Sequence, residues 1–93
     1  MAQVPYSDEE LSELRQQHET LESNPINGAD DLLRIGTILR EKARIPIMLL
    51  AQKLAVWTNV SYDPTAEELE RMTAQIMEFI EGVLKHPYKE ALN

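Results

Sequence analysis

The chain has no cysteine among its 93 residues. Small secreted domains usually depend on disulfides, so this absence favours a reducing compartment, and we expect a cytoplasmic protein. Residues 1–6 show neither the basic segment nor the apolar run of a signal peptide. The longest apolar run, residues 45–50, contains a proline and is far shorter than the roughly 20 residues that cross a bilayer. We therefore expect no association with a membrane.

Residues that commonly catalyse reactions or bind metals are also scarce. The two histidines, His18 and His86, are far apart in the sequence, whereas a metal site needs clustered ligands. No glycine-rich phosphate loop is present, and none of the four serines lies in a nucleophile elbow. The sequence therefore predicts no catalytic residue, no metal site and no cofactor, and we expect that the protein is not an enzyme.

What the chain has in excess is negative charge, with a net value of −7. Residues 7–22 carry six acids against one arginine, and residues 63–82 repeat that ratio. Residues 34–53 reverse it, with five basic residues against one acid. This basic segment either sets the arrangement of the helices or forms a docking surface for an acidic partner. Overall acidity disfavours binding to nucleic acid.

Helix-start signals occur at intervals along the chain. Ser7 with Glu10, and Thr65 with Glu68, form the spacing of a capping box. Acidic residues begin a second helix near residue 30, and Pro46 suits the start of a third. We expect an all-α fold, a small bundle of four short helices at about 8–22, 29–42, 46–58 and 65–85. The chain would be a single domain, 1–93, with short flexible termini at 1–6 and 87–93.

The predicted helices differ in how much apolar surface they carry. The first has only a thin apolar face, whereas segment 46–58 is apolar on nearly all sides. A helix of that kind is usually buried on several sides, so we expect it to be the central element or half of a dimer interface. Gly36 lies inside the second helix, where it either permits a close helix crossing or is merely tolerated.

One short segment resembles a motif of a known family. Residues 28–32, Gly-Ala-Asp-Asp-Leu, resemble the Gly-Ala-Asp-Ser-Leu motif of acyl carrier proteins, which are also small acidic four-helix domains. In that family the serine carries phosphopantetheine, and Asp31 stands in its place here. Aspartate cannot accept this group, so we expect no carrier function.

A second segment resembles a DNA-binding motif. Residues 50–56, Leu-Ala-Gln-Lys-Leu-Ala-Val, are similar to the first helix and turn of helix-turn-helix proteins. The family would place a glycine near Ala55, and the corresponding recognition segment, residues 57–62, contains no arginine or lysine. Base and phosphate contacts favour such side chains. This resemblance supplies an alternative function, an acidic helix-turn-helix-like regulator of transcription.

The main functional hypothesis follows from the unequal distribution of apolar residues. Three leucines on the first helix are too few to cover the third, and surface left uncovered would bind another protein. We expect a non-enzymatic protein-binding module, an adaptor, inhibitor or assembly factor, which can also be a homodimer. Trp57 is either part of this contact patch or part of the core. The predicted partner-binding residues are three aromatic or thioether side chains and three cations, namely Met48, Trp57, Tyr62, Arg40, Lys42 and Arg44.

Overall fold

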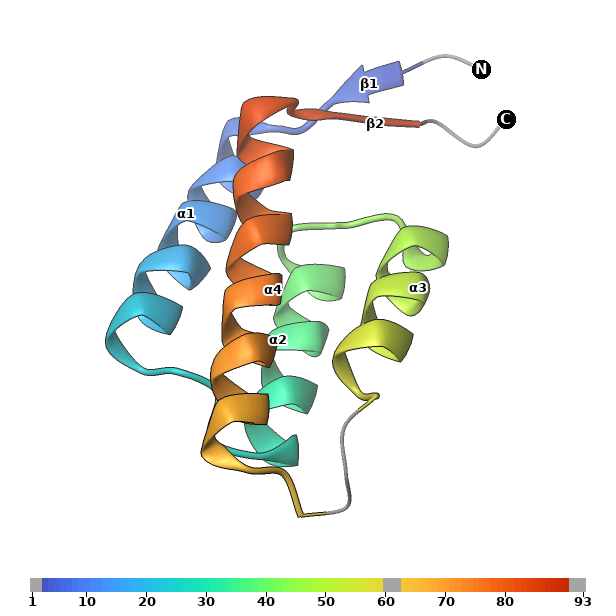
Figure 1. The fold of residues 1–93 in the computed structure, drawn as a ribbon. Coiled ribbons are helices and arrows are strands. Elements are labelled where there is room, and N and C mark those ends of the chain that lie inside the picture. Colours follow the sequence, from blue (N-terminus) through green and yellow to red (C-terminus); the bar gives the residue numbers. More distant parts are fainter. Residues whose placement is uncertain (1–2, 60–62, 91–93) are drawn as a thin grey trace.

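The computed structural model describes residues 3–59 and 63–90, and within them the fold is mostly helical. The helices are α1 (Asp8–Ser23), α2 (Ala29–Glu41), α3 (Ile47–Trp57) and α4 (Ala66–Lys85) (Figure 1). The expected all-α bundle is therefore confirmed, and each helix begins and ends within about one residue of its predicted bounds. No helix of the described ranges is long and apolar enough to cross a membrane.

Capping explains why the helix starts were predictable. The Ser7 hydroxyl accepts a hydrogen bond from the Glu10 backbone N–H at 3.1 Å, and the Glu10 carboxylate accepts one from the Ser7 N–H at 2.9 Å. Thr65 and Glu68 make the same reciprocal pair at the start of α4, at 3.1 Å each. Such pairs satisfy backbone donors that have no partner inside the helix. The signal is local in sequence and needs no tertiary contact.

A small β-ribbon joins the two ends of the described chain. Strand β1 (Gln3–Pro5) pairs antiparallel with β2 (Tyr88–Glu90), so that Val4 lies opposite Lys89 (Figure 1). The backbone N–H of Tyr6 also donates to the Pro87 carbonyl at 2.9 Å. Residues 3–6 and 87–90, which were expected to be flexible termini, are therefore paired with each other in this structure. These two segments are too short to show strand periodicity, and they order each other only because α1 and α4 bring them together.

The centre of the bundle is α4, not α3. Helix α4 packs along α1 and also contacts α3, while α2 packs against α3 (Figure 1). Fully buried side chains from all four helices belong to one core cluster: Leu14, Ile35, Leu39, Trp57, Ile76 and Ile80. In α3 only Leu50 and Trp57 are buried. Segment 46–58 was predicted to be either the central element or half of a dimer interface. The first alternative is wrong, because the all-round apolarity of α3 does not correspond to all-round burial.

Gly36 permits close packing between α2 and α3. A β-carbon built at this position would lie 3.3 Å from Cδ2 of Leu54, which is tighter than ordinary van der Waals contact. The structure therefore supports the interpretation that Gly36 permits a close helix crossing, and not the interpretation that it is merely tolerated. Leu54 rests on the space that the missing side chain leaves, and this contact helps attach α3 to the rest of the bundle.

Candidate functional site

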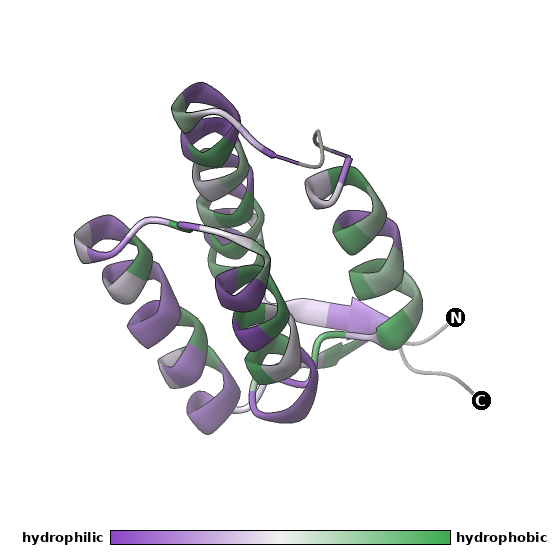
Figure 2. Cartoon of the chain, turned by 90° about the horizontal axis from the view of Figure 1, so that it is seen from below, coloured by the Kyte–Doolittle hydropathy of each residue, from purple (hydrophilic) through white to green (hydrophobic). Residues whose placement is uncertain are grey.

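The outward side of α3 is an exposed, largely apolar surface. Ile47, Met48 and Val56 are 60%, 70% and 56% exposed, and all three are large apolar side chains. Together with the exposed residues between them they form one continuous helix face, which we call the α3 face: Ile47, Met48, Ala51, Gln52, Ala55 and Val56. Residues spaced by one, four and five positions lie on the same side of a helix. The α3 face contains no charged residue, and Figure 2 shows the hydrophobic character of α3.

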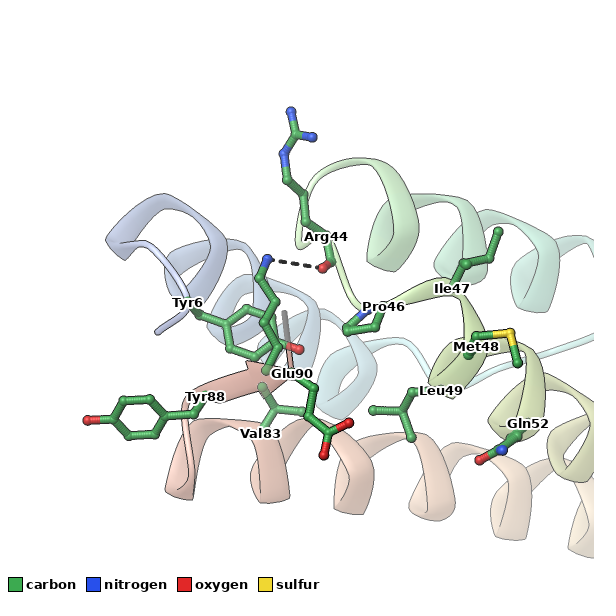
Figure 3. Close-up of a pocket in the computed structure, with 11 residues that line it drawn as sticks. Tyr6, Arg44, Pro46, Ile47, Met48, Leu49, Gln52, Val83, Tyr88 and Glu90 are labelled. Atoms are coloured by element: carbon green, nitrogen blue, oxygen red, sulfur yellow. Dashed lines mark hydrogen bonds between the residues drawn. The ribbon is translucent and has the colours of Figure 1, made fainter. Parts of the chain in front are cut away.

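An open groove of about 550 Å³ adjoins the first turn of α3. Its floor and walls come from α3, the end of α4 and strand β2 (Figure 3). Most of its lining is apolar, including Val83 of α4 and Leu49 of α3. The exposed ring of Tyr88 and the side chain of Met48 also line it, so that this groove, the β2 groove, is continuous with the α3 face.

A second groove, of about 280 Å³, runs along the other side of α3. It lies between α2 and α3 and is lined by the exposed Leu33 and the partly buried Leu54. Arg40 stands at this second groove, whereas Arg44 stands at the β2 groove. Helix α3 is thus a ridge with an apolar depression and an arginine on each side.

The loop before α3 is held in an unusual conformation. Arg44 has a φ of 54°, in the left-handed region that side chains other than glycine adopt rarely. Its carbonyl accepts a hydrogen bond from Nζ of Lys89 at 3.3 Å, which the dashed line in Figure 3 marks. The same ammonium group lies 3.3 Å from Oε2 of Glu10 and 4.8 Å from the centre of the Tyr6 ring. Lys89 of β2 therefore ties the backbone of this loop to α1.

Two groups around Lys89 have shifted pKa values. Burial on its own would raise the pKa of Glu10, but the hydrogen bond from the Ser7 backbone and the contact with Lys89 outweigh it and lower the pKa below 4.5. For Tyr6, burial and then the Glu10 charge both act against ionisation and raise the pKa to about 12. Around neutral pH the Glu10 carboxylate is therefore charged, as its ion pair with Lys89 requires, and the Tyr6 hydroxyl is neutral.

The cations of the corner between α2 and α3 are exposed. Arg40, Lys42 and Arg44, which we call the basic corner, all lie at the surface. The nearest carboxylate oxygens are 3.8 Å from Arg40, on Glu41, and 3.9 Å from Arg44, on Glu10. Arg40 and Glu41 are both exposed, so their ion pair contributes little. The Arg44 guanidinium is also largely exposed, and its distance from the buried Glu10 is at the outer limit of an ion pair. Both guanidinium groups can therefore bind an external acidic group at small cost.

The structure brings together only part of the predicted contact patch. Arg44 and Met48 line the same groove, and Arg40 lines the other. Lys42 is exposed at the corner but lines neither groove. Tyr62 lies outside the described residues.

Trp57 belongs to the core and not to the surface. It is 2% exposed, and its ring meets that of Phe79 edge to face, with centroids 5.6 Å apart. The prediction that Trp57 is a partner-binding residue is therefore wrong. An aromatic residue at the end of an apolar helix suits either place, and the packing of Phe79 decides between them.

Sequence reasoning also missed several residues of this surface. Ile47 and Val56 were not identified as exposed, because apolar residues surround nearly the whole helix and do not show which of them face outward. Tyr88 and Val83 line the β2 groove only because the ribbon folds beside α3. A helical wheel groups the exposed positions on one side of α3, but it does not tell which side faces the bundle.

The two motif resemblances lack structural support in the described chain. Helix α3 continues through Ala55 and Val56 to Trp57, where a helix-turn-helix motif would have its turn. Asp31 accepts a hydrogen bond from the Asn27 backbone at 2.9 Å, and so acts as a local cap near the start of α2.

His18 makes contacts that connect two helices and does not form a metal site. Its two ring nitrogens lie 2.9 Å from Glu22 and 2.8 Å from Glu81, on opposite sides of the ring. Because the Glu22 and Glu81 carboxylates lie at different nitrogens of the His18 ring, the three side chains cannot bind one metal ion together. The described residues also contain no group of three side chains suited to a metal. The contact connects α1 to α4.

Comparisons with known proteins do not assign a function to this surface. No family model, no curated protein and no solved structure matches the chain. The geometry and chemistry of the α3 face, its grooves and the basic corner are therefore the basis on which a function can be argued.

Proposed function

We propose that this chain is a non-enzymatic protein-binding module that acts by covering a surface of its partner, as an adaptor, inhibitor or assembly factor. The observation that carries the proposal is the α3 face. Three large apolar side chains, Ile47, Met48 and Val56, are each more than half exposed on one side of one helix. Isolated exposed apolar residues are ordinary on protein surfaces, but a continuous group of them is typical of an interaction site.

The surroundings of the α3 face fit the anatomy of a protein interface. Its centre is apolar and uncharged, and the arginines lie at its edges, beside the two grooves. Interfaces commonly have this apolar centre and polar rim, and methionine, tyrosine and arginine are enriched in them. Met48, Tyr88 and Arg44 supply these three residue types around the β2 groove.

The basic corner adds a preference for the charge of the partner. Arg40 and Arg44 are exposed and lie on the two sides of α3. A partner with acidic groups flanking an apolar segment would match this arrangement, and such complementarity mainly increases association rate and specificity.

Site-specific photo-crosslinking in the cells that produce the protein tests the proposal. A benzophenone amino acid replaces Met48, and in a matched control it replaces Gln16, which is exposed on α1. We expect a crosslinked protein product from position 48 and none from position 16. The absence of any protein product from position 48 would refute the proposed function.

Charge reversal tests the basic corner in the same assay. We expect Arg40→Glu with Arg44→Glu to lower the crosslinking yield from position 48, because an attractive rim becomes repulsive for an acidic partner. Arg71→Glu, an exposed arginine on α4, is the matched control and should leave the yield unchanged. An unchanged yield in the double variant would exclude the basic corner from the binding surface.

A further inference from the structure

We infer that the occupant of the α3 face is a second copy of this chain, whose own α3 lies antiparallel across it. The inference rests on the proposed function and narrows it to one partner and one orientation. It depends on three features of α3: the absence of charge on its exposed face, the unbalanced charges at its two ends, and the self-complementary sequence of that face.

The distribution of charge makes the α3 face suitable for contact between copies. Each chain carries a net charge of −7, so contact through most of its surface would bring like charges together. Helices α1 and α4 are rich in acids. The α3 face carries no ionisable side chain, and so it can meet its own copy without direct repulsion across the contact.

The ends of α3 favour an antiparallel pair. Helix α3 has no acidic residue in its first turn and no basic residue in its last, unlike α2 and α4, which have both. The partial charges at both ends of α3 are therefore not balanced by its own side chains. An antiparallel copy places each positive end beside a negative end, and it brings Arg44 toward the last carbonyls of the second α3. A parallel copy would place like ends together.

The residues of the α3 face complement themselves in this orientation. A two-fold axis between Ala51 and Gln52 sets Ile47 against Val56 of the second copy, and Met48 against Ala55. The small side chains of Ala51 and Ala55 allow the two helices to approach closely. The Gln52 amides lie near the axis, where one can donate a hydrogen bond to the other.

The size of the contact sets the expected affinity. Eleven residues of helix span about 16 Å, so the α3 face alone makes a small interface. Interfaces below about 1,200 Å² in total are typical of weak or transient complexes. We therefore expect a dimer with a dissociation constant of about micromolar or weaker.

Sedimentation velocity over a range of concentrations tests whether the dimer forms. We expect the purified chain to shift from monomer to dimer as its concentration rises, and Ala51→Glu to weaken the dimer at least about tenfold, since it buries a charge in an apolar contact. Ala74→Glu makes the same change at an exposed position of α4 and should leave dimerisation intact. Circular dichroism shows whether both variants remain folded.

Single cysteines test the orientation, because the natural chain has none. Treated with a short bifunctional maleimide, Ala51→Cys should crosslink to its own copy. Ile47→Cys should not, because two such positions lie about 14 Å apart along the axis in the antiparallel pair. A mixture of Ile47→Cys and Val56→Cys should crosslink.

The outcomes separate this inference from the proposed function. Efficient crosslinking of Ile47→Cys to itself would overturn the antiparallel orientation. A chain that stays monomeric at all concentrations would overturn the second copy as occupant. If Met48 then still crosslinks to a different protein in cells, the proposed function stands and only the identity of the partner changes. If Met48 crosslinks to nothing, both fail.

Discussion

At the scale of single residues, Glu10 is a charged group that connects three parts of the fold, namely α1, β2 and the loop before α3. Its carboxylate caps α1, contacts Lys89 of β2 and is only 11% exposed. Because its pKa is lower in the folded chain than the usual 4.5, the charged form stabilises the folded state above that pH. The contribution is lost as the pH falls through the folded-state value, where the carboxylate takes up a proton.

We therefore expect Glu10→Gln to lower the free energy of unfolding by about 1–3 kcal/mol at neutral pH. The difference from the natural chain should shrink as the pH falls below 4.5, because both chains then lack the charge. Urea unfolding at several pH values measures this. Glu70→Gln, at an exposed position of α4, is the control and should show almost no difference at any pH. A pH-independent effect of Glu10→Gln would refute the electrostatic role.

Two glycines inside helices give a matched residue-scale comparison. Gly82 has nothing within 4 Å of a built β-carbon, whereas at Gly36 that atom meets Leu54 at 3.3 Å. Alanine is favoured over glycine in a helix by about 1 kcal/mol. We expect Gly82→Ala to raise the free energy of unfolding by about 0.5–1 kcal/mol. We expect Gly36→Ala to raise it by less, or to lower it, because the added methyl group crowds Leu54. Thermal unfolding distinguishes them, and equal gains would show that Gly36 has no packing role.

At the scale of elements, the helices were predictable and their arrangement was not. Ser7, Thr65 and the residues three positions after them define helix starts through local hydrogen bonds, which the sequence displays directly. The β-ribbon depends on pairing Val4 with Lys89, 85 positions apart, and no local pattern marks that contact. Arg40 and Arg44 were predicted at the surface because they are cations on a chain reversal. Met48 was predicted there because methionine is enriched at interfaces. Trp57 was placed in the contact patch and Ile47 was not identified, because hydrophobicity alone does not tell which side of α3 meets α4.

Helix α3 should be the least stable of the four helices. Only Leu50 and Trp57 anchor it fully, and much of its other side is exposed. Elements with few buried contacts open at lower free energy than the elements of the core. We expect amide hydrogen exchange in dilute protein to be faster in α3 than in α1 or α4, and to slow selectively in α3 at high concentration. Protection of α3 equal to that of α4 would contradict its peripheral role.

At the scale of the whole molecule, the net charge of −7 should control self-association through salt. Two such chains repel each other at a distance, and added salt screens that repulsion. We expect the dimer to strengthen when the salt concentration rises from about 0.02 M to about 0.5 M, as the screening length falls from about 20 Å to a few ångströms. Light scattering at fixed protein concentration measures this. A dimer that weakens with salt would indicate contacts made mainly by the basic corner with acidic groups.

The ribbon that joins β1 and β2 also determines how the chain responds to mechanical tension. Gln3 and Glu90 form its outermost pair, and Pro5 and Tyr88 its innermost. When residues 3 and 90 are pulled apart from each other, the force therefore breaks the strand pairs one after another, from the outermost pair inward, and does not load all pairs at once. The strands should separate under a small load, and only then does tension reach the packed ends of α1 and α4.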